Sequence, residues 1–335
     1  MKDKLRMRRA TIFLTALFVV AGVLVVALDW RNVSHVVANA NWLFLPLPLL
    51  LTGASYVCLS CGFALVFRTF GIRVHFKELA QIGFVSNALA YLLNVGGVAG
   101  LPLQFLLLKR RGPRSEDILA ASIFQLLFSG LVLLLLLPIG LFNLLESGRG
   151  STRGNLALGI AAGTLTVLLV LAAVVVFVTP VRSQVLRTFS RAARLVTGRD
   201  VTTALNDFDL AMTRGLRLVS KRPAVFVLIL MLSAGDWTAT VAALWLCFHA
   251  LGQQIGLGVL LTGFGLGVTA GFVTLIPGGL GIQDGSMAGI FSLLGVPITV
   301  AVLAAILFRV VYYFVPFLVS LGFYRRLFRG AGGPG

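Results

Sequence analysis

Charged residues are scarce in this sequence, acidic ones most of all. Of 335 residues, 12% are charged, with 11 Asp and Glu against 28 Lys and Arg, while 58% are hydrophobic and the mean hydropathy is +0.99. A soluble domain carries about 25% charged residues. The composition therefore excludes an ordinary soluble protein and predicts an all-α integral membrane protein. Apolar segments occupy most of the chain, so we expect no separate soluble catalytic domain.

Cysteine and histidine are also rare, with 3 of each. His35, His75 and His249 lie in separate segments without metal-ligand spacing. Cys58 and Cys61 share a face of a predicted helix, but a zinc site would need a second pair of ligands. An ATP-binding glycine loop is absent as well. The sequence thus predicts no cofactor and no metal site, and it disfavours an enzyme.

The net charge of +17 comes from short basic segments between apolar ones. A nucleic-acid partner would need an exposed basic domain with base-reading groups, and the sequence has none. Lys and Arg stay on the cytoplasmic side of short membrane loops. They cluster in the tail before residue 10, in the connection 179–223 and at 325–329, whereas none occurs between Leu251 and Ile298. We therefore predict a multi-pass cell-membrane protein with both termini in the cytoplasm and basic loops facing anionic lipid headgroups.

Apolar segments alternate with these loops. They are Ala10–Leu28, Trp42–Phe67, Leu79–Leu93, Leu101–Leu108, Ile118–Leu145, Leu156–Val178, Ala224–Leu251, Leu257–Ile276, Met287–Val296 and Ile298–Tyr324. A helix needs about 20 residues to cross roughly 30 Å of hydrocarbon, so Leu101–Leu108 and Met287–Val296 are too short. We predict six full spans plus two re-entrant helical hairpins, at 79–108 and 257–296.

Both predicted hairpins contain a glycine-rich break, at 94–100 and at 274–284. Pro277 and the glycines interrupt a helix, and a bilayer tolerates freed backbone groups only inside protein or beside a polar cavity. Each half of the chain reads span, span, hairpin, span. Because each half crosses the membrane three times, the second half starts on the opposite side and is inverted relative to the first. The two hairpins would therefore enter the membrane from opposite sides, as in transporters with inverted repeats.

This organisation predicts five parts. Residues 1–150 form the first membrane repeat, 151–179 the first span of the second repeat, 180–222 a cytoplasmic amphipathic connection, 223–325 the rest of the second repeat and 326–335 a cytoplasmic tail. In the connection, Val181, Val185, Phe189, Ala192 and Val196 follow helical spacing, with Arg182, Arg187, Arg191 and Arg194 around them. This pattern is typical of a helix lying on the membrane surface.

Ionisable residues inside spans are the strongest functional candidates, because each costs at least ~2.5–3.5 kcal/mol to insert near the bilayer centre. Arg309 lies well inside the last span. Asp284, just beyond the second break, and Asp236, in the fifth span, are its candidate counter-ions. One reading is an ion pair that only fixes the hairpin against the last span. The other is a binding site in which Arg309 and backbone N–H groups hold an anionic headgroup.

Polar and small residues near the two breaks complete the candidate substrate-binding set. They are Gln283, Gly278, Gly279 and Gly281 at the second break, and Asn87, Asn94 and Gln104 at the first. For the three amides, hydrogen bonding between helices is an equally good explanation.

The segment Pro277-Gly278-Gly279-Leu280-Gly281-Ile282-Gln283-Asp284, followed by Leu294-Gly295-Val296-Pro297 and Arg309, resembles the second conserved block of the lysylphosphatidylglycerol synthase transmembrane-region family. This flippase-like family includes the membrane half of the multiple peptide resistance factor. Asp284 stands where the family usually has glutamate. The first glycine-rich block, 87–110, is similar too, but it has Leu101 and Gln104 where many members have an acid and an arginine.

The resemblance implies lipid handling without the soluble transferase that makes aminoacylated lipids. The leading hypothesis is a translocase for an anionic or aminoacylated phospholipid, or for a lipid-linked sugar. The alternative is an accessory membrane subunit of a separately encoded lipid-modifying enzyme or lipid-linked glycosyltransferase. The sequence leaves the headgroup, the direction, the energy source and a homo-oligomeric state open.

Overall fold

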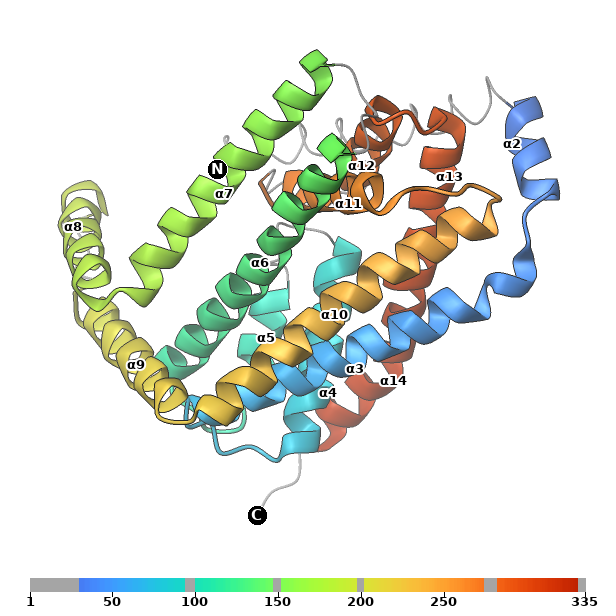
Figure 1. The fold of residues 1–335 in the computed structure, drawn as a ribbon. Helices are drawn as coiled ribbons and strands as arrows, with labels where there is room; N and C mark the ends of the chain where they lie inside the picture. Colours follow the sequence, from blue (N-terminus) through green and yellow to red (C-terminus); the bar gives the residue numbers. More distant parts are fainter. Residues whose placement is uncertain (1–29, 94–99, 147–151, 198–201, 274–281, 331–335) are drawn as a thin grey trace.

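Helices form the regular structure of the part of the chain that the computed structural model describes, which is residues 30–93, 100–146, 152–197, 202–273 and 282–330 (Figure 1). The helices are α2 (Trp30–Ala38), the 3-10 helix η1 (Trp42–Phe44), α3 (Pro46–Thr69), α4 (Phe76–Leu93), α5 (Gly100–Lys109), α6 (Ser115–Glu146), α7 (Thr152–Phe177), α8 (Thr179–Thr197), α9 (Thr202–Ser220), α10 (Pro223–Ala250), α11 (Leu257–Val273), α12 (Ile282–Leu293), α13 (Ile298–Arg309), the π-helix η2 (Val310–Phe314) and α14 (Val315–Gly330). No strand occurs in these ranges, and the predicted all-α class is confirmed.

Three of the described helical segments are long and apolar enough to cross a membrane: Trp42–Thr69, Pro223–Ala250 and Ile298–Arg325. A fourth arises if α7 and α8, bent by 91° between them, count as one broken span. The backbone of α6 is also long, 32 residues or roughly 48 Å at 1.5 Å per residue. The predicted first span, Ala10–Leu28, lies outside the described residues, so the count of six spans stays a prediction.

The two short apolar segments fold as helices that pack beside their neighbours in the chain. Helix α5 contacts α4, and α12 contacts α11. A Cβ atom on Gly263 would lie 2.4 Å from the Phe291 ring, and one on Gly267 would lie 2.7 Å from the Cβ of Met287. Along α11, Gly263 precedes Gly267, but its neighbour in α12, Phe291, follows Met287. The two helices therefore run antiparallel, at a distance that only glycine permits. The breaks that join each pair, 94–99 and 274–281, lie outside the described residues.

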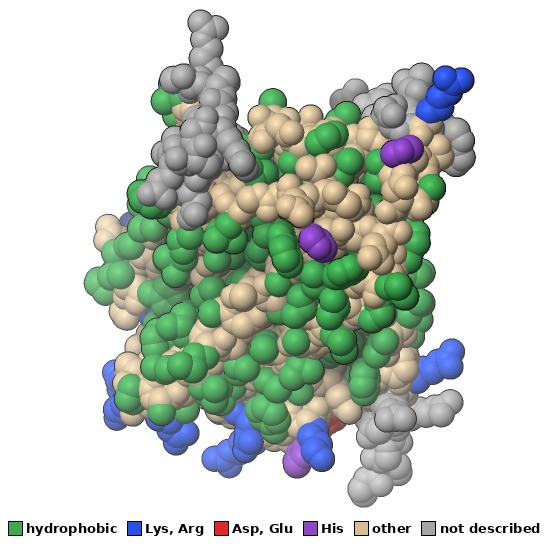
Figure 2. Space-filling model, turned by 45° about the vertical axis from the view of Figure 1, so that its right-hand side comes forward, with side chains coloured by type: hydrophobic (Ala, Val, Ile, Leu, Met, Phe, Trp, Pro, Cys, Tyr) green, Lys and Arg blue, Asp and Glu red, His purple; other side chains and the backbone are tan. Residues whose placement is uncertain are grey.

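Around these pairs, the long helices form a bundle. Helix α3 lies along α10, α6 packs against α11, α14 flanks α4, and α13 contacts both α10 and α12 (Figure 1). Hydrophobic side chains cover the middle of the face shown in Figure 2, and most of its Lys and Arg side chains lie along the lower edge. An apolar belt with basic residues at one end is the surface expected of a protein surrounded by lipid.

The predicted amphipathic connection contains α8 and α9. Arg182, with 2% of its side chain exposed, points inward and donates to Asp209 Oδ1 and Thr213 Oγ1, both at 2.5 Å. Val185 and Phe189 point outward and are 43% and 59% exposed. The helical spacing thus predicted α8, but not that one of its arginines is buried and ties α8 to α9.

Candidate functional site

The start of α12 and the end of α13 bring the two strongest sequence candidates together. Asp284 lies in the first turn of α12, and Arg309 is the last residue of α13. The Arg309 guanidinium forms an ion pair with the Asp284 carboxylate, and the two side chains are 17% and 15% exposed. The structure therefore confirms Asp284 as the counter-ion of Arg309. The first turn of a helix also favours an anion, because its free N–H groups carry partial positive charge.

Two further side chains surround this ion pair. The Arg309 guanidinium lies over the Tyr313 ring, 5.7 Å from its centroid, in a cation–π arrangement. Gln283 Nε2 donates to the Tyr313 hydroxyl at 2.8 Å. Within the described residues, Nη2 of Arg309 has no hydrogen-bond partner. Among the described residues, the arrangement therefore leaves one guanidinium N–H group available beside the first turn of α12.

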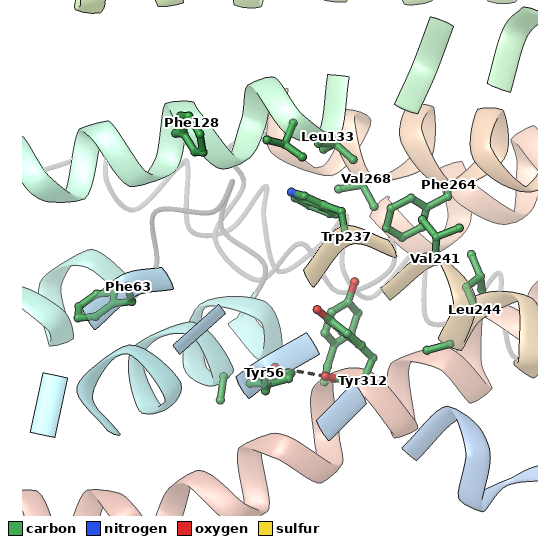
Figure 3. Packing of buried hydrophobic residues seen from close by; sticks show 14 of the residues in the cluster. Tyr56, Phe63, Phe128, Leu133, Trp237, Val241, Leu244, Phe264, Val268 and Tyr312 are labelled. Atoms are coloured by element: carbon green, nitrogen blue, oxygen red, sulfur yellow. Dashed lines mark hydrogen bonds between the residues drawn. The ribbon is translucent and has the colours of Figure 1, made fainter. Parts of the chain in front are cut away.

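The last span carries a π-helix directly after Arg309. The N–H of Val315 donates to Val310 O, five residues back, which is the π-helical pattern. Proline at 316 explains the irregularity, because it has no N–H to give to the carbonyl of Tyr312 and its ring would collide with that carbonyl in a regular helix. The Tyr56 hydroxyl donates to Tyr312 O instead, at 3.2 Å (Figure 3). The altered register leaves Tyr312 and Tyr313 both buried.

Asp236 belongs to a different group of contacts, and its assignment as a counter-ion of Arg309 is wrong. Ser55 Oγ donates to Asp236 Oδ1 at 2.5 Å, and the same hydroxyl lies 2.7 Å from the Tyr312 hydroxyl. Thr240 Oγ1 is 2.8 Å from the Tyr312 hydroxyl. Asp236 projects from α10 toward α3 and η2, where its carboxylate accepts from Ser55 Oγ, whereas Arg309 faces α12.

The candidates from the first helical pair make contacts within the protein. Asn87 Nδ2 donates to Gly83 O in its own helix at 2.8 Å. Gln104 Nε2 donates to Ser122 Oγ of α6 at 2.6 Å, and both side chains are buried. Four further candidates lie outside the described residues: Asn94, Gly278, Gly279 and Gly281.

Sequence reasoning missed the tyrosines and hydroxyl groups of this region. Tyr312 and Tyr313 follow Arg309 in a strongly apolar span, where aromatic residues are ordinary packing. The available signal was Pro316, which removes a helical hydrogen bond four residues earlier and so marks Tyr312 as the place where the helix changes. Ser55 offered no signal, because its role depends on the pairing of α3 with α10.

The helical bundle, its apolar spans and the ion pair inside the last span define an integral membrane protein with a polar site at helix ends. The chain belongs to the family described as the lysylphosphatidylglycerol synthase TM region, whose family model matches residues 13–320. The resemblance found in the sequence is thereby confirmed.

Curated relatives share shorter segments with this chain. A UPF0104 membrane protein of Methanothermobacter thermautotrophicus is 29% identical over 97 residues, which is 29% of this chain and 28% of that protein. A second match of the same name and organism is 32% identical over 117 residues, 35% of this chain and 33% of the relative. A phosphatidylglycerol lysyltransferase of Staphylococcus aureus is 31% identical over 91 residues, 27% of this chain and 11% of the enzyme. The matched segments thus cover a third or less of these relatives.

Proposed function

We propose that this protein is a lipid translocase of the cell membrane, which moves an anionic or aminoacylated phospholipid, or a lipid-linked sugar, between the leaflets. The observation that carries the proposal is the Arg309–Asp284 ion pair inside an apolar bundle, where one guanidinium nitrogen, Nη2, has no hydrogen-bond partner among the described residues. Family membership supports it, because a relative in the comparison is a phosphatidylglycerol lysyltransferase, whose name specifies a lipid headgroup.

The chemistry of the pair suits a headgroup. Arg309 offers charge-assisted donors to a phosphate, and Asp284 offers an acceptor to an ammonium group such as that of an aminoacyl ester. The phosphate of a zwitterionic headgroup would then replace Asp284 as the partner of Arg309, and its ammonium group would replace Arg309 as the partner of Asp284. Each side chain would keep an opposite charge beside it, which limits the cost of separating the two. Gln283 and Tyr313 would add neutral hydrogen-bonding groups.

The two antiparallel helical pairs support a route across the membrane. We propose that α4–α5 and α11–α12 are re-entrant hairpins of an inverted repeat, entering from the cytoplasm and from outside, with both chain termini in the cytoplasm. In this arrangement the inner ends of the two helical pairs would meet near the midplane. The headgroup would cross there while its acyl chains stay in lipid.

Reconstitution into liposomes tests this proposal. Headgroup-labelled phosphatidylglycerol, lysyl-phosphatidylglycerol and a lipid-linked sugar would each be followed by reduction of the label on the outer leaflet. For at least one lipid, we expect fast exchange in the wild type and a loss of about tenfold or more in Arg309→Ala, since a charge-assisted hydrogen bond contributes about 1.5–3 kcal/mol. Equal rates for wild type, Arg309→Ala and empty liposomes with every lipid would refute it.

A second ion pair provides a matched control. Arg111 Nε donates to Glu78 Oε1 at 2.5 Å and ties the turn after α5 to the first turn of α4, on elements other than those of the proposed site. Arg111→Ala also removes the arginine of an ion pair, although its carboxylate partner is more exposed, 38% for Glu78 against 15% for Asp284. If it abolished exchange as completely as Arg309→Ala does, the effect of Arg309 would be structural and not a matter of headgroup binding.

The accessory-subunit alternative rests on the match to 91 residues, or 11%, of a phosphatidylglycerol lysyltransferase. Under this alternative, exchange would occur only when a separately encoded lipid-modifying enzyme is reconstituted with the protein. Co-purification in mild detergent, followed by the same exchange assay with and without the partner, separates the two functions.

A further inference from the structure

Asp236 is a buried carboxylate that the proposed headgroup site does not use. Its side chain is 2% exposed, inside a helix that qualifies as a membrane span. Among the described residues, no Lys, Arg or His forms an ion pair with it. A carboxylate without a cationic partner in an apolar interior is neutralised by taking up a proton, because its charged form loses the solvation of water.

In the part of the chain that the structure describes, the groups around Asp236 are all uncharged in their protonated forms. The titratable side chains close enough to feel its charge are Tyr56 and Cys58 of α3, Tyr91 of α4 and Tyr312 of η2. On the remaining side, α6 presents amide and hydroxyl groups. None of these can compensate a negative charge with a positive one, so a proton is the available counter-charge.

A small cavity beside Asp236 has room for a water molecule that could deliver this proton. It has a volume of about 20 Å³ and is lined by Asp236, Ser233, Ser129, Gln125 and Cys58, together with apolar residues of α3, α6 and α10. About 10–15 Å³ measured in this way suffices for one water molecule, and the polar lining supplies its partners. A hydronium ion reaching the cavity would transfer a proton to a carboxylate oxygen of Asp236, leaving a neutral carboxyl group and water.

Protonation changes which groups donate in the hydrogen-bond chain. When Asp236 is ionised it only accepts, so Ser55 donates to it, and the Ser55 oxygen can accept from the Tyr312 hydroxyl. When Asp236 is protonated it donates to Ser55, which then donates to Tyr312. Tyr312 lies on the π-helix that begins one residue after Arg309. A change at Asp236 therefore reaches the helix segment that carries the proposed headgroup site.

We propose that Asp236 is a proton-binding site of this protein, and that its protonation is linked through Ser55 and Tyr312 to the helix that carries Arg309. The first part stands on the cavity and on the hydrogen-bond chain around the carboxylate. The second part rests on the proposed function, because the linkage is to headgroup binding.

Infrared spectroscopy of the full-length protein in nanodiscs tests the proton site without any lipid substrate. A protonated buried carboxyl group gives a C=O stretching band separate from those of ionised carboxylates. We expect this band in the wild type at low pH, its decrease as pH is raised from 5 to 9, and its loss in Asp236→Asn at every pH. Asp284→Asn is the matched control and should leave the band unchanged, because Asp284 is paired with Arg309.

Asp236→Glu keeps a carboxyl group and should retain the band at a shifted frequency, which covers the case in which the Asn variant folds poorly. Ser55→Ala should also shift the frequency, because it removes the group hydrogen-bonded to the carboxyl. A wild-type protein without such a band at pH 5, or with a band that Asp236→Asn does not remove, would overturn the proposal.

The linkage is measured by the pH dependence of labelled-lipid exchange. We expect the wild-type rate to change by roughly threefold or more between pH 6 and pH 8, and the rate of Asp236→Asn to be flat over that range. The same pH profile in both proteins would overturn the linkage. If the infrared band titrates as expected but the wild type exchanges no lipid, the proton site stands and the proposed translocase function fails.

Discussion

The two antiparallel helical pairs, α4–α5 and α11–α12, have similar architecture but use their polar residues differently. In the first pair, Gln104 donates to Ser122 of the next helix, and Asn87 donates to its own backbone. In the second pair, Asp284 forms an ion pair with Arg309 of the last span. Removing a neutral amide that joins two helices costs little stability, whereas removing one member of a buried ion pair leaves the other charge uncompensated and costs much more. Chemistry should therefore concentrate at the second pair.

The largest effect on stability is expected from Asp284→Ala. This change leaves the Arg309 guanidinium buried without its carboxylate, which costs about 3–5 kcal/mol in buried ion pairs. Thermal unfolding in detergent would show it as a marked decrease in Tm. Asp284→Glu, which keeps the charge, should recover most of the loss. A change in stability below about 1 kcal/mol for Asp284→Ala would mean that the pair behaves as an exposed one.

The close approach of α11 and α12 gives the next largest effect. A Cβ on Gly267 would overlap Met287, so Gly267→Ala should separate the helices and destabilise the protein by about 1–3 kcal/mol. Gly289→Ala on α12 is the control, since a Cβ there has no neighbour within 4 Å and alanine favours a helix by up to about 1 kcal/mol. Thermal unfolding of both variants compares them directly, and equal values would argue against the tight pairing.

The sequence predicted much of this fold because its signals are local. Apolar segments and their lengths located the helices, and the short segments 101–108 and 287–296 indicated the two pairs. It also identified Asp284 as a partner of Arg309, because few charges occur in this part of the chain. Asp236 was misassigned for the same reason. Its contacts with Ser55 and Tyr312 connect residues far apart in the chain, and no local pattern encodes which helices pack together.

The first helical pair should tolerate the loss of its buried amide. Gln104→Leu removes the hydrogen bond to Ser122 Oγ, which itself still donates to Ile118 O, so the cost should be about 1 kcal/mol or less. Lipid exchange should stay within about threefold of the wild type. Thermal unfolding and the rate of lipid exchange, measured on the same preparation of Gln104→Leu, test both expectations. A loss of exchange as large as that of Arg309→Ala would show that the two pairs share the site equally.

The smallest expected effect is a coupling energy between two residues, and it tests how the first half of the chain supports the last span. Tyr56 donates to the Tyr312 carbonyl that Pro316 leaves without a helical donor, so Tyr56→Phe should cost about 1 kcal/mol. Pro316→Ala restores an N–H that can reach the same carbonyl in a regular helix. In the Pro316→Ala background, Tyr56→Phe should then cost much less, and the double-mutant cycle should give a coupling of about 0.5 kcal/mol or more. Thermal unfolding of the four proteins provides the cycle. Additive effects would mean that the π-helix does not arise from the missing proline N–H, and that the tyrosine hydroxyl is incidental to the position of Arg309.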